Sequence, residues 1–166
     1  CRVIPDPADF FALLRYCRRN KIKKSTRSFV YIDEAVVRDM FRENELFKKV
    51  EDAIKSNRIE VFYQPIYSTR HRKFTSAEAL VRMYDEQGNL LPVFESIKAS
   101  EESGQIHQIG EIVFEKVCQM IQNEHIEQYG LEYIEVNLSM AQCSDDKLAE
   151  RYICLLYTSD AADDLT

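Results

Sequence analysis

The sequence predicts an α/β fold, and three observations carry this prediction. Residues 59–67 and 74–84 are rich in β-branched and aromatic side chains, as β-strands are. A third segment of this kind, 133–138, follows only after two segments with helical spacing of apolar residues, 92–100 and 106–123. The order strand, strand, helix, helix, strand, helix is the order in which an α/β barrel begins.

The first part of the chain predicts a helix over residues 8–20, because apolar residues recur on one side and prolines precede them. The basic run 18–24 follows. We favour a solvated helix end that complements the helix dipole over a phosphate-binding patch. Residues 28–32 have the composition of a short strand.

A long helix is predicted over residues 33–56, with Asp33 as its N-cap. Acidic residues near its start and lysines near its end suit the helix dipole. One apolar stripe runs along it, formed by Val36, Met40, Phe47, Val50 and Ile54. The stripe fits a connector between two domains. A pairing seam is the alternative, so a homodimer of the full-length protein stays open.

The next segments alternate between apolar strands and polar turns. Residues 68–73 form the turn between the first two predicted strands of the sheet, and residues 85–89 end the second. Gly130 turns the chain into the third strand, and the polar segment 139–151 is predicted to be helical.

The composition limits the class of protein. The chain has 166 residues, of which 45% are hydrophobic and 30% charged, which is ordinary for one or two globular domains. A net charge of −6 argues against DNA or RNA as a partner, but it leaves room for a small anionic nucleotide held by local cations. Five cysteines without a CxxC pair fit a reducing compartment, so we expect a cytoplasmic domain. The apolar runs are too short to span a membrane, although a membrane anchor elsewhere in the full-length protein stays open.

The segment Glu78–Arg82 contains the main candidates for ligand-binding residues. Alternation along a strand places Ser76, Glu78, Leu80 and Arg82 on one face. A carboxylate and a guanidinium on either side of an apolar residue suit a ligand that combines a metal-bound phosphate with a flat base. The five residues alone are a weak motif.

Four motifs in order make the pattern specific. These are Tyr63-Gln64-Pro65-Ile66, Glu78-Ala79-Leu80-Val81-Arg82, Glu101-Glu102-Ser103-Gly104-Gln105-Ile106 and Val136-Asn137-Leu138-Ser139. Together they resemble the first part of an EAL domain, the bacterial phosphodiesterase that opens cyclic di-GMP. The resemblance implies a truncated EAL-type barrel, a modified TIM-like fold, whose N-terminal part would occupy residues 58–153. Residues 1–32 resemble the C-terminal end of a GGDEF (diguanylate cyclase) domain, and 33–57 would be the connector helix.

The resemblance also implies roles for particular residues. Glu78 and Asn137 would be the metal ligands of the catalytic site, for Mg²⁺ or Mn²⁺, and metal-activated water would hydrolyse cyclic di-GMP to a linear dinucleotide. Arg82 would contact phosphate, Gln64 would contact the nucleotide, and Leu80 would pack near it. Oxygen ligands and a planar guanidinium suit these tasks.

Each assignment has a structural alternative. Glu78 could face solvent, although its position between Ala77 and Ala79 favours burial beside a cation. Arg82 could pair with Asp85 or Glu86, Asn137 could be a cap residue, and Gln64 could be an ordinary interior amide. The order of the motifs favours the functional interpretation. A non-catalytic cyclic di-GMP receptor and a structural dimerisation module remain the competing functions.

Two features depart from the family pattern. Ser96-Ile97-Lys98 stands where the family usually has Phe-Ile-Pro, after a displaced Phe94. The family carries further metal ligands downstream of these motifs, and two oxygen ligands do not organise a pair of hard cations. We therefore expect a fragment without appreciable phosphodiesterase activity.

Residues 154–166 are expected to be a non-native, adapter-like tail, and a disordered polar terminus is the alternative.

Overall fold

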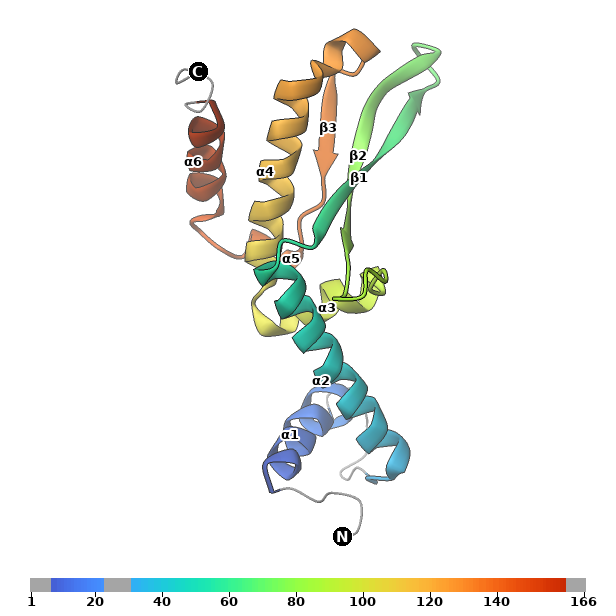
Figure 1. Cartoon of the computed structure of the whole chain (residues 1–166), viewed down its shortest axis with the longest axis vertical. Coiled ribbons are helices and arrows are strands. Elements are labelled where there is room, and N and C mark those ends of the chain that lie inside the picture. Colours follow the sequence, from blue (N-terminus) through green and yellow to red (C-terminus); the bar gives the residue numbers. More distant parts are fainter. Residues whose placement is uncertain (1–6, 23–30, 161–166) are drawn as a thin grey trace. The chain divides into compact units, whose positions relative to one another are not determined.

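The computed structural model describes residues 7–22 and 31–160, and the chain divides into two compact units, Cys1–Lys48 and Lys49–Thr166. The elements, in chain order, are α1 (Pro7–Cys17), a π-helical turn (Arg18–Ile22), α2 (Glu34–Lys55), β1 (Ile59–Ser68), β2 (Lys73–Met83), α3 (Val93–Ser103), α4 (Ile106–Glu124), a 3₁₀ turn (Ile126–Tyr129), β3 (Tyr133–Val136), α5 (Met140–Cys143) and α6 (Leu148–Asp160). Figure 1 labels the α-helices and strands. From β1 to α5, the predicted order strand, strand, helix, helix, strand, helix is confirmed.

The first unit has a core of α1 side chains and side chains from the beginning of α2. Its buried members are Leu13, Tyr16, Cys17, Val36, Val37 and Met40. Arg19 forms an ion pair with Glu43 and lies over the Phe47 ring, 5.5 Å from its centroid. Arg19, one member of the basic run that was predicted to be a solvated helix end, is therefore paired within this unit.

Asp33 is the N-cap of α2, as predicted. Its Oδ1 accepts a hydrogen bond from the Val36 backbone N–H at 2.9 Å, which satisfies a donor that the helix itself leaves without a partner. The predicted strand 28–32 is not supported where it can be followed: Tyr31 and Ile32 lie in a loop, and residues 28–30 are outside the described part of the chain.

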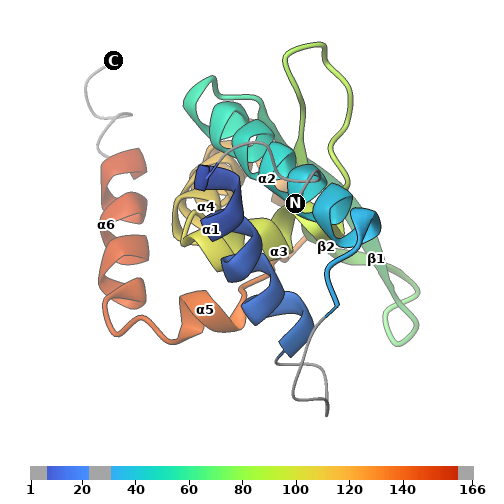
Figure 2. The ribbon, with the colours of Figure 1, turned by 90° about the horizontal axis from the view of Figure 1, so that it is seen from below.

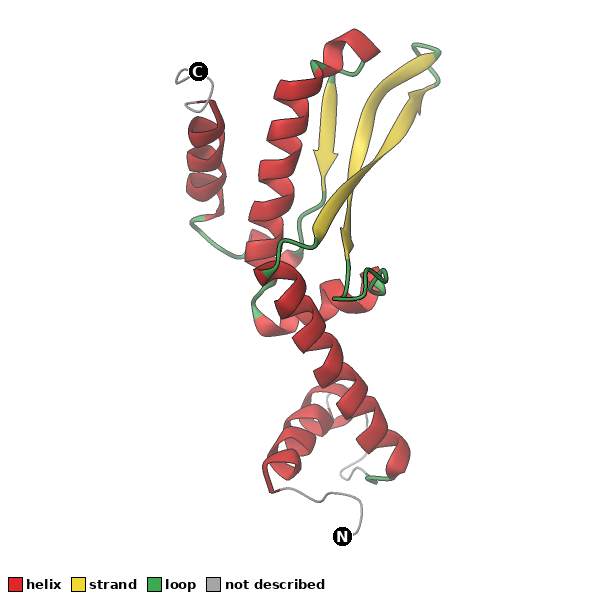
Figure 3. Ribbon diagram, in the orientation of Figure 1, coloured by secondary structure: helices red, strands yellow, loops and turns green. Residues whose placement is uncertain are grey.

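The second unit is built on a three-stranded sheet in the order β1-β2-β3 (Figure 3). Strand β2 is central: it pairs antiparallel with β1 and parallel with β3. The antiparallel hairpin places Gln64 opposite Glu78, and the parallel pairing places Glu78 in register with Glu135. All three predicted strands are present, and β3 ends at Val136, two residues before the predicted end.

Helix α4 covers one face of this sheet. Its buried side chains, among them Ile109, Val113 and Val117, face the apolar side of the strands, and the Tyr63 hydroxyl of β1 donates to the Lys116 carbonyl at 3.4 Å. Ala79, which lies opposite Tyr63 in register, is 3% exposed. Because side chains alternate along a strand, Gln64, Glu78 and Glu135 lie on the opposite face.

The segment 139–151, predicted as one helix, is two helices. A capping box begins α5 at Ser139, and a turn at Ser144–Lys147 separates α5 from α6. Asp145 stabilises this turn, since its Oδ1 accepts from the Lys147 N–H at 2.9 Å. Helix α6 then lies beside α4 (Figures 1 and 2), with the Tyr152 ring stacked on Phe114.

The segment expected to be a tail begins inside α6. Residues 154–160 are helical, so this part does not form the disordered terminus that was the alternative, and residues 161–166 lie outside the described ranges. Its non-native origin stays a prediction. Of the helices within residues 7–22 and 31–160, none is long and apolar enough to cross a membrane.

Candidate functional site

The side chains of Glu78 and Asn137 meet at the carboxyl end of β3. The Asn137 Nδ2 atom donates to Glu78 Oε1 at 2.6 Å, although 59 residues separate the two positions. The register explains the contact: Glu78 pairs with Glu135 across the parallel strands, and Asn137 is two residues further along the same face. The sheet thus brings together the two residues that the sequence proposes as metal ligands.

The neighbours of Glu78 fix the face on which it lies. Ala77 and Ala79 are 1% and 3% exposed, and Ala79 shares the α4 side of the sheet with Tyr63. Glu78 therefore points away from α4. Glu78 is half-buried and Asn137 is exposed. The burial that the sequence predicts for Glu78 is therefore only partly observed.

A row of polar residues crosses all three strands at this level. Gln64 stands opposite Glu78, and Glu78 stands in register with Glu135. Directly opposed residues on antiparallel strands have Cβ atoms about 5 Å apart, so Gln64 is an immediate neighbour of Glu78. Sequence reasoning missed Glu135, although its position two residues before Asn137 was the available signal.

Arg82 lies on the same face, further along β2. Its guanidinium lies over the Phe62 ring at 5.4 Å, and its Nη1 donates to the Val81 carbonyl at 2.8 Å. An arginine held by an aromatic face and one backbone oxygen keeps other N–H donors for a ligand. Leu80, half-buried, lies between Glu78 and Arg82 on this face, opposite Phe62 in register.

Asp85, the alternative partner of Arg82, belongs to the turn that ends β2. Its Oδ1 accepts from the backbone N–H groups of Gln87 and Asn89, at 3.0 and 2.8 Å, and both its oxygens contact the Asn89 side chain. These hydrogen bonds, led by the backbone N–H of Asn89, hold the pKa of the Asp85 carboxyl below its usual range. The carboxylate therefore has a structural role in the turn.

The cap role that was the alternative for Asn137 is performed by Ser139. Its Oγ accepts from the Gln142 N–H at 3.3 Å, while Gln142 Oε1 accepts from the Ser139 N–H at 3.0 Å. The Ser-x-x-Gln pattern of a capping box was visible in the sequence and was not used. With Ser139 as the cap, Asn137 can turn its side chain to Glu78.

A cavity of about 290 Å³ lies next to this site, between the strands and α3 and α4. Its lining is mostly apolar, including Val81, Ile97, Ile109 and Val113, with Arg82, Glu101 and Asn137 as polar members. Glu101, for which a helix-end charge was the simpler account, thus lies near the site.

The donor set suits a hard divalent cation. Glu78 offers a carboxylate, and Asn137 offers a carbonyl oxygen when its amide is turned the other way. No cluster of three or more His, Cys, Asp or Glu side chains able to hold a metal occurs within the described ranges. Glu78 and Asn137 thus offer two oxygen ligands, fewer than the six or more that such a cation takes.

The chain is similar to several known proteins. The family model of the EAL domain matches residues 48–166. The signaling protein YkoW of Bacillus subtilis (strain 168) is 35% identical over 91 residues, which are 55% of this chain and 11% of that protein. The uncharacterized protein y4lL of Sinorhizobium fredii is 33% identical over 98 residues, 58% of this chain and 11% of that protein. The chain thus spans about a tenth of the length of these relatives.

Solved structures show the same fold. A PaMucR phosphodiesterase in complex with c-di-GMP superposes with a TM-score of 0.62 at 24% identity, covering 69% of this chain and 46% of that one. The FimX EAL domain from Pseudomonas aeruginosa bound to c-di-GMP gives 0.60 at 22% identity, over 70% of this chain and 46% of that one. The sheet and helices of the second unit therefore have the arrangement of these domains.

Proposed function

Because the chain belongs to the EAL domain family, we propose that its β2–β3 site takes part in the hydrolysis of cyclic di-GMP to a linear dinucleotide. The observation that carries the proposal is the hydrogen bond of 2.6 Å between Glu78 of β2 and Asn137, the residue that follows β3. The two side chains meet where the parallel pairing of β2 with β3 ends on its C-terminal side, and barrel enzymes carry their chemistry at the carboxyl ends of parallel strands. The solved EAL structures whose titles name c-di-GMP support the choice of ligand.

Glu78 and Asn137 are the proposed ligands of divalent cations, Mg²⁺ or Mn²⁺. Such cations supply an activated water and neutralise charge on phosphate oxygens. Binding replaces the hydrogen bond between the two side chains, because Asn137 must then present its oxygen and not its nitrogen. Binding of a cation therefore requires the Asn137 amide to turn.

Arg82, Gln64 and Leu80 are the proposed substrate contacts. The guanidinium over Phe62 is oriented by the ring, and its planar fork suits two phosphate oxygens. Gln64 offers an amide beside Glu78, and Leu80 offers an apolar surface between the carboxylate and the guanidinium. Together these residues can hold the nucleotide and orient its phosphate.

A receptor that binds cyclic di-GMP without cleaving it is the second candidate. It would use Arg82 and Gln64 and would not need Glu78. The close pairing of Glu78 with Asn137 favours hydrolysis, because a receptor has no use for two adjacent metal ligands. We place the protein in the cytoplasm, since five unpatterned cysteines suit a reducing compartment.

The division of the chain is also proposed. Residues 1–32 are assigned to a GGDEF-like domain and 33–57 to a connector, with the apolar stripe on α2 as a candidate homodimer contact. The family match covers residues 48–166, so it includes the proposed EAL part, 58–153, and also the last ten residues of the proposed connector.

The test is a hydrolysis assay on the complete gene product that carries these residues, with cyclic di-GMP and Mn²⁺. Glu78→Gln keeps the size of the side chain and removes its charge. The control is Glu115→Gln, an exposed glutamate on α4. We expect Glu78→Gln to lose at least about a hundredfold in rate and to retain nucleotide binding, because a metal ligand acts on the chemical step. Hydrolysis at the wild-type rate by Glu78→Gln would refute the proposal, and binding without hydrolysis by the wild-type protein would favour the receptor.

A further inference from the structure

We propose that Gln142 is a positioning residue for Asn137: it fixes the turn after β3 so that the Asn137 side chain faces Glu78. The inference rests on the proposed function, because it concerns how the same site is held in place. Gln142 acts on Asn137 indirectly. It acts on the backbone at Ser139, two residues after Asn137.

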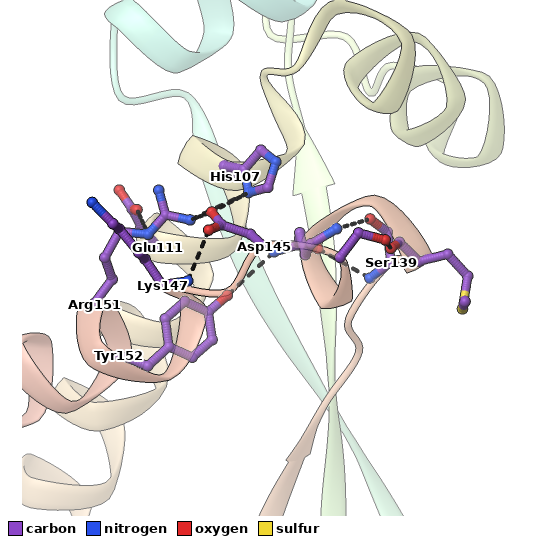
Figure 4. A network of polar contacts seen from close by, with 10 residues as sticks. His107, Glu111, Ser139, Asp145, Lys147, Arg151 and Tyr152 are labelled. Atoms are coloured by element: carbon purple, nitrogen blue, oxygen red, sulfur yellow. Dashed lines mark hydrogen bonds and ion pairs between the residues drawn. The ribbon is translucent and has the colours of Figure 1, made fainter.

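Both ends of the Gln142 amide are used. The oxygen accepts from the Ser139 N–H at 3.0 Å, and the nitrogen donates to the Tyr152 hydroxyl at 3.2 Å (Figure 4). The side chain is 2% exposed, so neither hydrogen bond is weakened by competing water. One amide thus joins the turn that follows Asn137 to helix α6.

Tyr152 is itself anchored to the helix that covers the sheet. Its ring is stacked on Phe114 of α4, with centroids 4.6 Å apart and an interplanar angle of 18°. Burial raises the pKa of the Tyr152 hydroxyl, so the group stays neutral near pH 7. The link therefore runs from Ser139 through Gln142 and Tyr152 to α4.

Helix α4 has a glycine, Gly110, at the point where it meets Gln142 and Tyr152. A Cβ atom at Gly110 would lie 2.7 Å from the Tyr152 hydroxyl and closer still to the Gln142 amide nitrogen. Gly110 is buried and has an ordinary helical conformation, so the backbone at this position does not require a glycine. The glycine provides the space that the Gln142 amide fills.

A second group of contacts fixes the chain beyond α5. Asp145 accepts from the Lys147 N–H at 2.9 Å and forms an ion pair with Arg151, whose Nε lies 3.5 Å from Glu111 Oε1 on α4. His107 Nδ1 of α4 lies 3.7 Å from Asp145 Oδ2 (Figure 4). Helix α5 is therefore held at both ends, at Ser139 by Gln142 and beyond Cys143 by Asp145.

Loss of the Gln142 side chain is expected to affect the site because Ser139 lies only two residues after Asn137. If Gln142 loses its side chain, the Ser139 N–H loses its acceptor and the turn gains freedom to rotate. Groups that orient a metal ligand typically change metal affinity by about 10- to 100-fold when they are removed. Gln64 and Arg82 are on β1 and β2, so their contacts with nucleotide are expected to stay intact.

The experiment compares Gln142→Ala and Gln142→Glu in the complete gene product. Glutamate keeps an acceptor for the Ser139 N–H and can accept from the Tyr152 hydroxyl, so it is the conservative rescue. The control is Gln128→Ala, which removes a glutamine whose side chain bonds to the Glu124 carbonyl near the end of α4. We expect Gln142→Ala to raise the Mn²⁺ concentration at half-saturation about tenfold, with the KM for cyclic di-GMP within about twofold of wild type.

A second measurement needs no metal. In the metal-free protein, the side-chain amide resonances of Asn137 report its hydrogen bond to Glu78. We expect them to shift toward the values of a free amide in Gln142→Ala, and to remain as in wild type in Gln142→Glu and Gln128→Ala. If Gln142→Ala does not fold, Tyr152→Phe carries the test, with a smaller shift in the same direction.

Unchanged Mn²⁺ half-saturation and unchanged Asn137 resonances in folded Gln142→Ala would overturn the inference. Failure of the proposed function is distinguishable from this outcome: Mn²⁺ binding by the wild-type protein would then be absent, or insensitive to Glu78→Gln. The metal-free resonances would still decide whether Gln142 positions Asn137.

Discussion

The amide of Gln142 fills the space beside Gly110 that any larger residue on α4 would need for its side chain. Both positions are buried, and the two elements that carry them, α5 and α4, meet there without an intervening side chain from α4. The close approach explains why a glycine is found within a long helix, where it is otherwise unfavourable by about 0.5–1 kcal/mol relative to alanine.

Gly110→Ala is accordingly expected to destabilise the protein by about 1–3 kcal/mol, in spite of the better helix propensity of alanine, because the added methyl group overlaps a fixed amide. The free energy of unfolding in urea measures the effect. The matched control is the same substitution in a Gln142→Ala background, where the closest contact is gone. Equal destabilisation in both backgrounds would contradict the role of Gln142 in the overlap.

The lowered pKa of Asp85 predicts that the free energy of unfolding decreases at acid pH. Hydrogen bonds from backbone N–H groups lower its folded-state pKa, so its contribution is present above the unfolded pKa and is lost as the pH falls through the folded value. We expect Asp85→Asn to reduce the difference in unfolding free energy between pH 7 and pH 3. Thermal or urea unfolding across this range checks the result. Glu86→Gln, at the exposed neighbouring position, serves as the control; an equal reduction there would argue against a special role for Asp85.

The N-cap of α2 offers a test of local helix stability. Asp33→Ala removes the acceptor of the Val36 N–H and is expected to destabilise the helix by about 1 kcal/mol. Asp33→Ser keeps an oxygen at the cap and is expected to restore most of the loss. Urea unfolding followed by circular dichroism measures both variants, and wild-type stability of Asp33→Ala would show that the cap contributes nothing.

Arg82→Lys tests the proposed phosphate contact. Lysine keeps the charge but loses the planar fork and the stacking on Phe62, so we expect about tenfold weaker binding of cyclic di-GMP. Calorimetric titration without divalent cations measures affinity apart from hydrolysis. Arg70→Lys, on the exposed turn between β1 and β2, is the control, and the same loss of affinity there would indicate an effect of arginine content and not of position.

The strands could be predicted from the sequence because the alternation of side chains is a local property. The pair Glu78 and Asn137 could be proposed because four motifs in order resemble a known family. The antiparallel and parallel registers could not be predicted from the sequence. Glu135 was missed because only the pairing of β2 with β3 brings it beside Glu78. The division of residues 139–151 into two helices was missed as well. Ser139 carries the Ser-x-x-Gln pattern of a helix start, whereas Asp145 fits a helix surface, and its hydrogen bond with the Lys147 N–H is known only from the folded chain.

Gln142 illustrates the same limit at the site. Its Ser-x-x-Gln pattern predicts a capping box, but nothing in the sequence links it to Tyr152 or to Gly110, which are 10 and 32 residues away in the chain. These contacts depend on how α5 and α6 are placed against α4, and that placement is a property of the folded domain.

The most direct test of the central proposal, that Glu78 and Asn137 converge on divalent cations, is Mn²⁺ binding by the complete gene product in a double-mutant cycle of Glu78→Gln and Asn137→Ala. We expect each single variant to weaken Mn²⁺ binding by at least about tenfold, and the double variant to bind about as poorly as the weaker single one, because neither residue holds the ion well without the other. Wild-type affinity for Mn²⁺ in either single variant would contradict the account.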